Sequence, residues 1–427
     1  MKARLACAGC AALLIAVSFA QLHPAAAFSS EPMLSPGAML PFAGVRASTP
    51  LWRWVSHVPF AHAALAWEAI FVFALLGLIA GAALFARVRG LFDIVCVALA
   101  ALAFAPVASA LTTGATVIVA AAAAALAAGL RTLPALGAGS FLAFAVQPNA
   151  ALGLFASVRR GGAPALAFAF AAIYLGNALI AGFAWPLFYA RTLVALARSE
   201  GGSVLQFTPA AIAQGLGAPP LLAAAIGVAL GLAAAAAAVT VALRARDDCS
   251  GFVAGCCALP FVCGFFHAAG FSALFAASIA SLRGRSPGAA LCAVIALGAN
   301  WQAPLLGLAL IAACLALAPR IEIRTLAGAA AGALILTFGS WLAIAHPLHE
   351  WTDAVRSLSL PANANSAALW HIELAHSGLL GAHPANALLR LLALGGCALL
   401  LATAARTSDV DVHHVVERRD AVGMEVL

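Results

Sequence analysis

Two long apolar segments of this chain are each interrupted by polar residues that could bind a ligand. The first, 132–158, contains the sequence Gln-Pro-Asn at 147–149, and the second, 249–282, contains His267 as its only histidine or charged residue. Amide and imidazole groups can line a polar pocket, and a helix N-terminus at such a turn can receive phosphate oxygens. The alternative is structural, because Pro-Asn is a common turn pair and a lone buried histidine is often simply hydrogen-bonded.

Basic residues lie at both ends of these two segments. The first is flanked by Arg131 and the pair at 159–160, and the second by Arg246 and Arg283. A single membrane crossing would place one basic cluster on the outer side, against the positive-inside rule. We therefore expect each segment to form a short hairpin of two half-length or tilted helices, the second turning within 260–267.

The turns of the two hairpins are expected to meet. Polar backbone at membrane depth is tolerated only where protein or a water-filled cavity surrounds it. The sequence therefore predicts that the polar residues at 147–149 and His267 lie near each other, at an outward-facing cavity.

Transmembrane helices must position these residues. A hydrocarbon core ~30 Å thick takes ~20 helical residues. Of all residues, 64% are hydrophobic and 9% are charged, and the mean hydropathy is +1.04. A large soluble core would need far more polar residues to cover its surface. Long stretches of 27 residues or more contain no Asp, Glu, Lys or Arg, among them 94–130, 132–158, 201–243 and 249–282.

These observations predict an all-α, polytopic integral membrane protein with about twelve transmembrane helices, the two short hairpins included. One membrane domain is expected over 1–404, with 1–27 as a signal anchor or first span, and 405–427 as a short, disordered cytosolic tail. Larger outer loops are expected at 28–60, 187–216 and 346–382. Single spans are expected near 5–27, 61–86, 91–110, 116–132, 164–186, 217–243, 287–300, 302–318, 325–345 and 383–404.

The basic residues also predict the orientation. With the N-terminus in the cytosol, 16 of the 22 arginine and lysine residues fall on the cytosolic side and six on the other. This is a positive-inside bias, and it predicts a multi-pass membrane protein with its N-terminus in the cytosol. The net charge of +7 is thus a topology signal and does not indicate a nucleic-acid partner.

Neither a metal nor a cofactor is indicated. The last outer loop carries the sequence His-x-x-His-Glu at 346–350, which has metal-ligand residue types without a closed zinc spacing. A divalent metal there is an open alternative, with a polar periplasmic loop as the default. The chain has no Walker or Rossmann glycine pattern that would bind a nucleotide.

Four segments between about 50 and 285 resemble, in order, those of glycosyltransferase family 87. They read "PLWRWVSHVPFAHAALAWEAI", "PVASALTTGATVIVAAAAAALAAG", "GAGSFLAFAVQPNAALGLFASVRR" and "LPFVCGFFHAAGFSALFAASIASLRGR". The third resembles the family's lysine/glutamine-proline hairpin, with Gln147 and Pro148 at the key positions. The fourth resembles its proline-to-histidine hairpin, with Pro260 and His267 matching. In the second, the family's usual Gly-Gln pair is replaced by Gly-Ala at 114–115.

The resemblance implies a GT-C-type membrane enzyme that uses a polyprenyl-phosphate sugar, typically mannose, as donor. It would move the hexose to an acceptor on the outer face and need no nucleotide there. His267, Gln147 and Asn149 would then bind the substrate. Arg191 and Arg198, on an outer loop, suit a lipid phosphate, with interfacial anchoring as the alternative. A membrane transporter and a catalytically inactive scaffold of the same fold are the other function classes.

The catalytic base is where the chain departs from the family, which carries an acidic residue, usually Asp, in its first outer loop. This chain has no Asp before Asp93, and the only carboxylate of that loop is Glu31, which we expect to be the base. Glu68 is next, although the bilayer edge favours its acid form. Glu200 lies in a loop without a catalytic acid in the family. The six carboxylates predicted to lie outside are Glu31, Glu68, Glu200, Glu350, Asp353 and Glu373.

The orientation is testable. We expect a reporter fused after Leu427 to behave as cytosolic, because the arginine distribution places an even number of crossings before it. A fusion of alkaline phosphatase, which is active only in the periplasm, should be inactive there, and one of green fluorescent protein should be fluorescent. The opposite pair of signals would contradict the predicted topology.

Overall fold

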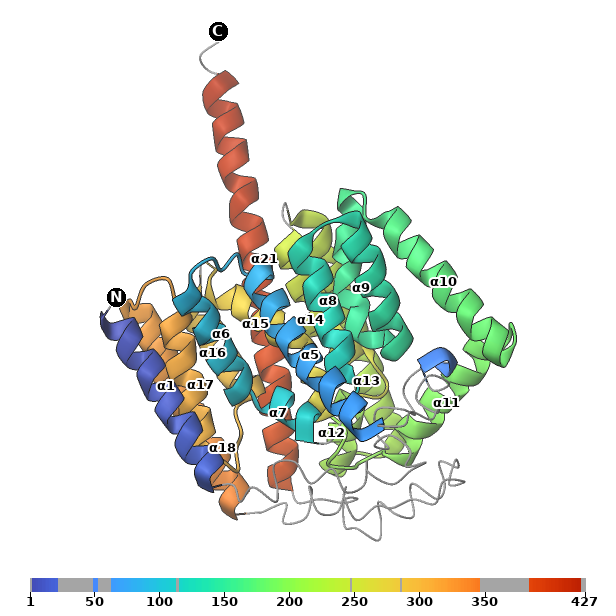
Figure 1. Cartoon of the computed structure of the whole chain (residues 1–427), viewed down its shortest axis with the longest axis horizontal. Helices are drawn as coiled ribbons and strands as arrows, with labels where there is room; N and C mark the ends of the chain where they lie inside the picture. Colours follow the sequence, from blue (N-terminus) through green and yellow to red (C-terminus); the bar gives the residue numbers. More distant parts are fainter. Residues whose placement is uncertain are drawn as a thin grey trace.

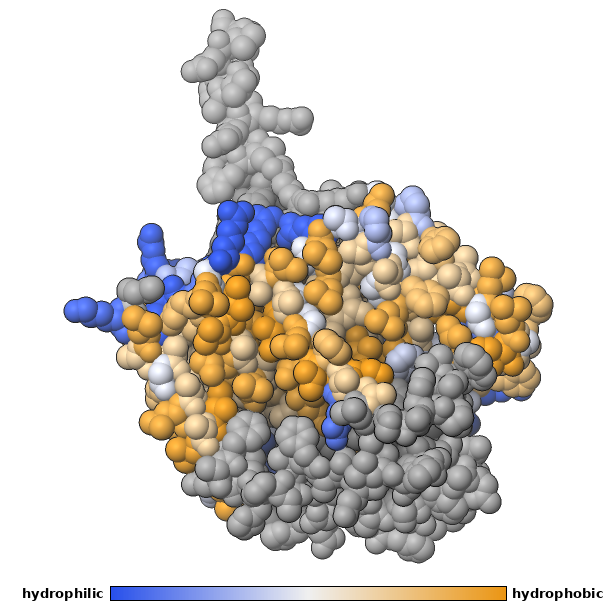
Figure 2. All heavy atoms as spheres, viewed as in Figure 1, coloured by the Kyte–Doolittle hydropathy of each residue, from blue (hydrophilic) through white to orange (hydrophobic). Residues whose placement is uncertain are grey.

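The computed structural model describes residues 2–21, 49–52, 63–112, 115–245, 248–284, 286–345 and 384–423. Within these residues every regular element is a helix, and one isolated bridge pairs Gln206 with His267. The all-α prediction is therefore confirmed for the described part of the chain. The helices form one bundle (Figure 1), and hydrophilic residues gather at the end that carries the N-terminus, above a broad apolar belt (Figure 2).

The element order begins with α1 (Lys2–Gln21), α5 (Ala63–Phe85), α6 (Leu91–Ala103), α7 (Ala105–Thr112), α8 (Val117–Leu130), α9 (Leu133–Val146), the 3₁₀ helix η2 (Pro148–Arg160), α10 (Ala163–Ala181) and α11 (Trp185–Ser199). It continues with α12 (Pro209–Gly215), α13 (Pro220–Arg244), α14 (Asp248–Val262), the 3₁₀ helix η3 (Ala268–Leu274), α15 (Phe275–Leu282), α16 (Pro287–Gly298), α17 (Pro304–Leu317), α18 (Ile323–Ala345) and α21 (Pro384–Gly423).

Five of the described helices are long and apolar enough to cross a membrane, as expected for a polytopic membrane protein. They lie in α5, α10, α13, α18 and α21, and α6 with α7 adds a sixth if that bent pair is one span. The other apolar helices have 10–17 residues, so a total of twelve spans stays a prediction.

Three sequence predictions are corrected by the helix boundaries. The span predicted over 91–110 breaks at Phe104, where α6 and α7 meet at 68°. Pro106 has no backbone N–H to continue the hydrogen bonding of α6, but it is tolerated in the first turn of the new helix α7. The outer loop predicted at 187–216 contains most of α11 and all of α12. The tail predicted to be disordered is helical through Gly423 as the continuation of α21, which projects beyond the bundle in Figure 1.

Both hairpin segments are divided into short helices. In the first, α9 ends at Val146, Gln147 is extended with φ −152°, and η2 begins at Pro148. In the second, α14 runs through Pro260 to Val262, so its turn starts slightly later than predicted and is followed by η3 and α15. The start of α9 and the end of η2 lie side by side, since a Cβ on Gly162 would lie 2.7 Å from Leu136 Cδ2.

Small residues let neighbouring helices approach closely, as the alanine runs indicate. At the crossing of α5 and α8, a Cβ on Gly81 would lie 2.6 Å from the backbone carbon of Ala125. At the crossing of α16 and α18, a Cβ on Gly328 would lie 2.2 Å from the backbone oxygen of Gly288. At these two crossings the helix backbones are in direct contact, and a larger residue at either glycine would push the helices apart.

An ion cluster ties the N-terminal helix to the end of the bundle that we call the basic end, defined by Arg4, Asp93 and Arg283. The carboxylate of Asp93 pairs with Arg4 and, at 3.2 Å, with Arg283 Nη1. Arg4 Nε also donates to the backbone oxygen of Ala316 at 2.7 Å. Segments far apart in sequence are thereby held together at one end, the end that the arginine distribution predicts to be cytosolic.

The helix crossing gives a stability prediction. Gly81→Ala should lower the free energy of unfolding by about 1–3 kcal/mol, because the new methyl group meets backbone that cannot rotate away. The readout is the apparent melting temperature of the purified protein in detergent. Gly9→Ala in α1 is the control, since nothing lies within 4 Å of its Cβ position. Equal melting temperatures for the two variants would contradict the close approach.

Candidate functional site

A group of buried polar residues lies between three parts of the chain: the 200–208 connection from α11 to α12, the turn after α14, and the first turns of α21. We call it the polar network and define it as Glu200, Gln206, His267 and Arg390. It lies toward the end of the bundle opposite the basic end, because α21 starts there and its C-terminal part projects from the other end (Figure 1).

The central contact joins a carboxylate to an imidazole. Glu200 Oε2 lies 2.6 Å from His267 Nε2, with Glu200 only 1% exposed and the His267 side chain 17% exposed. A carboxylate accepts hydrogen bonds, so Nε2 carries the proton in this contact. In the neutral imidazole the other nitrogen, Nδ1, is then a proton acceptor. The pair has the chemistry of a histidine base oriented by an acid.

Gln206 holds this pair in position. Its Nε2 donates to Glu200 Oε2 at 2.8 Å, and its Oε1 accepts from the backbone nitrogen of Phe266 at 3.0 Å. Phe207 N also donates to Phe266 O at 2.8 Å, beside the bridge between Gln206 and His267. The loop that carries Glu200 and the turn that carries His267 are thus fastened by backbone and side-chain bonds together.

Arg390 fastens the same loop to α21. It is 3% exposed, and its Nη1 donates to the backbone oxygens of Ser203 at 2.8 Å and Gln206 at 2.9 Å. Its Nε donates to Asn386 O, one turn earlier in α21, at 3.2 Å. A buried guanidinium engaged by carbonyl groups fixes the loop against the helix.

The two hairpin turns are brought together. The first hairpin packs on α14, where a Cβ on Gly153 would lie 2.8 Å from Cys256 Sγ, and the Asn149 side chain lies beside the Cys263 thiol, four residues before His267. Its Oδ1 is buried and has no hydrogen-bond partner among the described residues. Gln147 lies at the same turn, where its backbone nitrogen donates to Ala143 O at 2.8 Å. The turn at 147–149 therefore lies beside the segment that leads into the polar network.

The other predicted site residues are not part of this network. Arg191 and Arg198 are exposed on α11, and Glu68 is exposed on α5. Glu31, the predicted base, lies outside the described residues, as does the histidine-rich loop at 346–383. Among the residues that the structure describes, no group of three or more His, Cys, Asp or Glu side chains could hold a metal ion.

Sequence reasoning set Glu200 aside and passed over Gln206. One signal was available for Glu200, which is the only carboxylate between Asp93 and Asp247 and directly precedes a charge-free stretch. Arg390 carried a stronger one, because a charge inside a predicted span is costly and is a functional candidate by default. Neither signal reveals a contact with His267, which is 67 residues from Glu200 in sequence.

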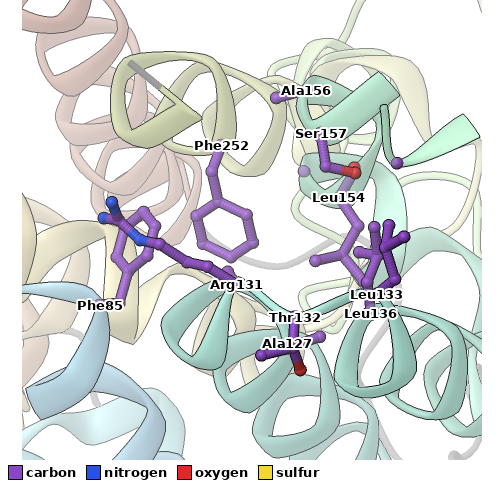
Figure 3. Close-up of a pocket in the computed structure, with 13 residues that line it drawn as sticks. Phe85, Ala127, Arg131, Thr132, Leu133, Leu136, Leu154, Ala156, Ser157 and Phe252 are labelled. Atoms are coloured by element: carbon purple, nitrogen blue, oxygen red, sulfur yellow. The ribbon is translucent and has the colours of Figure 1, made fainter. Parts of the chain in front are cut away.

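A separate cavity of about 270 Å³ lies among the end of α5, the α8–α9 connection, η2 and the start of α14 (Figure 3). Its walls include Phe85, Leu136, Leu154 and Phe252, and Arg131 is the charged residue that lines it. None of the predicted site residues lines this cavity. Its apolar walls distinguish it from the polar network.

The fold and these contacts define a helical integral membrane protein with a buried polar site. Comparisons with protein-family models, with curated proteins and with solved structures find no match for the chain.

The meeting of the two turns gives a cross-linking prediction. In a variant whose other cysteines are replaced by alanine, Asn149→Cys should form a disulfide with Cys263 under mild oxidation, because the native side chains are in reach. Mass spectrometry of a protease digest detects the linked peptides. Ser157→Cys in the same background is the matched control, since it lies at the far end of η2. Absence of the 149–263 link in folded protein would contradict the packing.

Proposed function

We propose that this protein is a membrane glycosyltransferase that moves a hexose, mannose, from a polyprenyl-phosphate donor to an acceptor on the outer face of a bacterial plasma membrane. The resemblance of four segments to glycosyltransferase family 87 supports this assignment. The observation that carries it is the buried Glu200–His267 pair at 2.6 Å, beside the meeting point of the two resembling hairpins. The donor lipid and the surrounding membrane lipid are the proposed partners.

The reaction requires few groups. An acceptor hydroxyl attacks the anomeric carbon and loses its proton to a base, while the bond from that carbon to the phosphate oxygen breaks and the phosphate leaves with the electron pair. His267 Nδ1 is the proposed base, with Glu200 holding the tautomer and stabilising the imidazolium that forms. The unpartnered Oδ1 of Asn149 can accept a hydrogen bond from a sugar hydroxyl, and Gln147 can line the same pocket.

Two carboxylates compete for the acidic role. The resemblance favours Glu31 as the direct base, because it follows the first span as the family's acid does. The geometry favours Glu200, which already contacts a histidine. We take the His267–Glu200 pair as the base and keep Glu31 as the alternative that experiment decides. Arg191 and Arg198 stay proposed as contacts for lipid phosphate at the membrane surface.

Substitutions separate these assignments. Glu200→Gln and His267→Ala should each lower sugar transfer by ~10²–10⁴-fold, since general-base losses are of this size. The assay follows transfer of radiolabelled mannose from polyprenyl phosphate in membranes that contain the protein. Glu322→Gln, at an exposed position outside the site, is the control that keeps the wild-type rate. Undiminished transfer in both site variants, with loss in Glu31→Gln, would move the base to Glu31.

A proton-coupled transporter is the second candidate, and one observation favours it. The polar network places a titratable acid–histidine pair and an arginine of α21 together within a membrane protein, as proton-linked transporters require. The two proposals differ in what they consume. Transfer needs a sugar donor and no proton gradient, whereas coupled transport in proteoliposomes would respond to a pH gradient without any donor.

A further inference from the structure

The guanidinium of Arg390 has unused hydrogen-bonding capacity. An arginine carries five N–H donors, one on Nε and two on each terminal nitrogen. Here Nε donates to Asn386 O and Nη1 donates to two backbone oxygens, those of Ser203 and Gln206. Both N–H groups of Nη2 therefore have no acceptor among the described residues. The residue as a whole is 3% exposed, so most of the side chain is enclosed by protein.

Arg390 also has no carboxylate in direct contact with it among the described residues. The direct contacts between basic and acidic side chains there are those of Asp93 with Arg4 and Arg283, and that of Glu200 with His267. Backbone carbonyl groups satisfy hydrogen bonds but carry no net charge. A buried cation in a membrane span is costly unless an anion accompanies it. The open N–H groups of Nη2 could therefore receive an oxygen of an anion.

We propose that Arg390 is the anion-binding group of the polar network and that Nη2 holds the phosphate of a prenyl phosphate. This inference rests on the proposed function and assigns the residue that receives the leaving phosphate. Gln206 supports the placement, because its backbone oxygen accepts from Arg390 while its side chain donates to Glu200. Gln206 thus links Arg390 to the Glu200–His267 pair by hydrogen bonds.

Gly215 leaves the room that this arrangement needs. A Cβ at this position, the last residue of α12, would lie 2.8 Å from Arg390 Nη2 and 3.9 Å from its Cζ. A methyl group there meets the tip of a flexible side chain and not backbone. Gly215→Ala should therefore displace Nη2 while the fold and the charge are kept, and it separates anion binding from the structural role of Nη1.

The probe for direct binding is farnesyl phosphate, titrated into the purified full-length protein in neutral detergent and followed by calorimetry. Arg390→Gln and Gly215→Ala should each weaken binding by ~10–100-fold, the size expected for losing hydrogen bonds to a charged group. Arg390→Lys should fall between wild type and Arg390→Gln, since it keeps the charge but not the shape and donors of the guanidinium. Gly395→Ala, in the same helix with nothing within 4 Å of its Cβ position, should bind like wild type.

Further ligands define the source of the anion. Farnesol should not bind, because it lacks the charge. Inorganic phosphate that competes with farnesyl phosphate at similar concentration would support the anion site with free phosphate as its ligand. Competition by phosphatidylglycerol in the detergent micelle would support the same site with a lipid headgroup as its ligand.

The anion site and the transferase can fail separately. Wild-type protein that does not bind farnesyl phosphate would overturn the anion site. Equal binding by wild type and Gly215→Ala, with melting temperatures unchanged, also overturns it. Arginine-dependent binding without any sugar transfer would keep the anion site and remove the glycosyltransferase assignment.

Discussion

A polar group buried in a membrane protein is costly unless it finds a partner inside the protein, and this constraint shapes the polar network. Gln206 shows how completely it is met, since its side-chain amide, its side-chain oxygen and its backbone oxygen each have a named partner. Removing any one of these partners would leave a buried donor or acceptor of Gln206 without a hydrogen bond, which is costly. The 200–208 connection can be irregular here because Gln206 and Arg390 together provide hydrogen bonds to its backbone and to Glu200.

The hairpin prediction used a global rule, and both segments are divided into short helices as it requires. Basic residues at both ends of each segment require the chain to return to the side from which it started, whatever the local helix preference. The break at Phe104 depends on a local effect, the proline two residues later, and was missed because the apolar stretch runs on unbroken. Hydropathy reports burial in lipid, but it does not report where a helix bends.

The site was harder to predict than the fold, for a physical reason. His267 and Asn149 could be singled out because a polar residue in an apolar stretch is conspicuous in one dimension. Glu200 stands at the edge of such a stretch, where a solvated loop carboxylate is the usual reading. Its burial to 1% exposure arises from contacts with the turn at 267 and with Gln206, which exist only after the bundle has assembled.

The 3₁₀ form of η2 connects the hairpin geometry to the site. A segment of 13 residues rises ~26 Å as a 3₁₀ helix but only ~20 Å as an α-helix, so the tighter helix extends a short segment farther through the bundle. Such a run is stable only with close packing on a neighbour. That packing is with α14, where a Cβ on Gly255 would lie 2.7 Å from Gly153 Cα. Because η2 is fixed on α14 at this point, its first turn carries Asn149 to Cys263, next to the turn that presents His267.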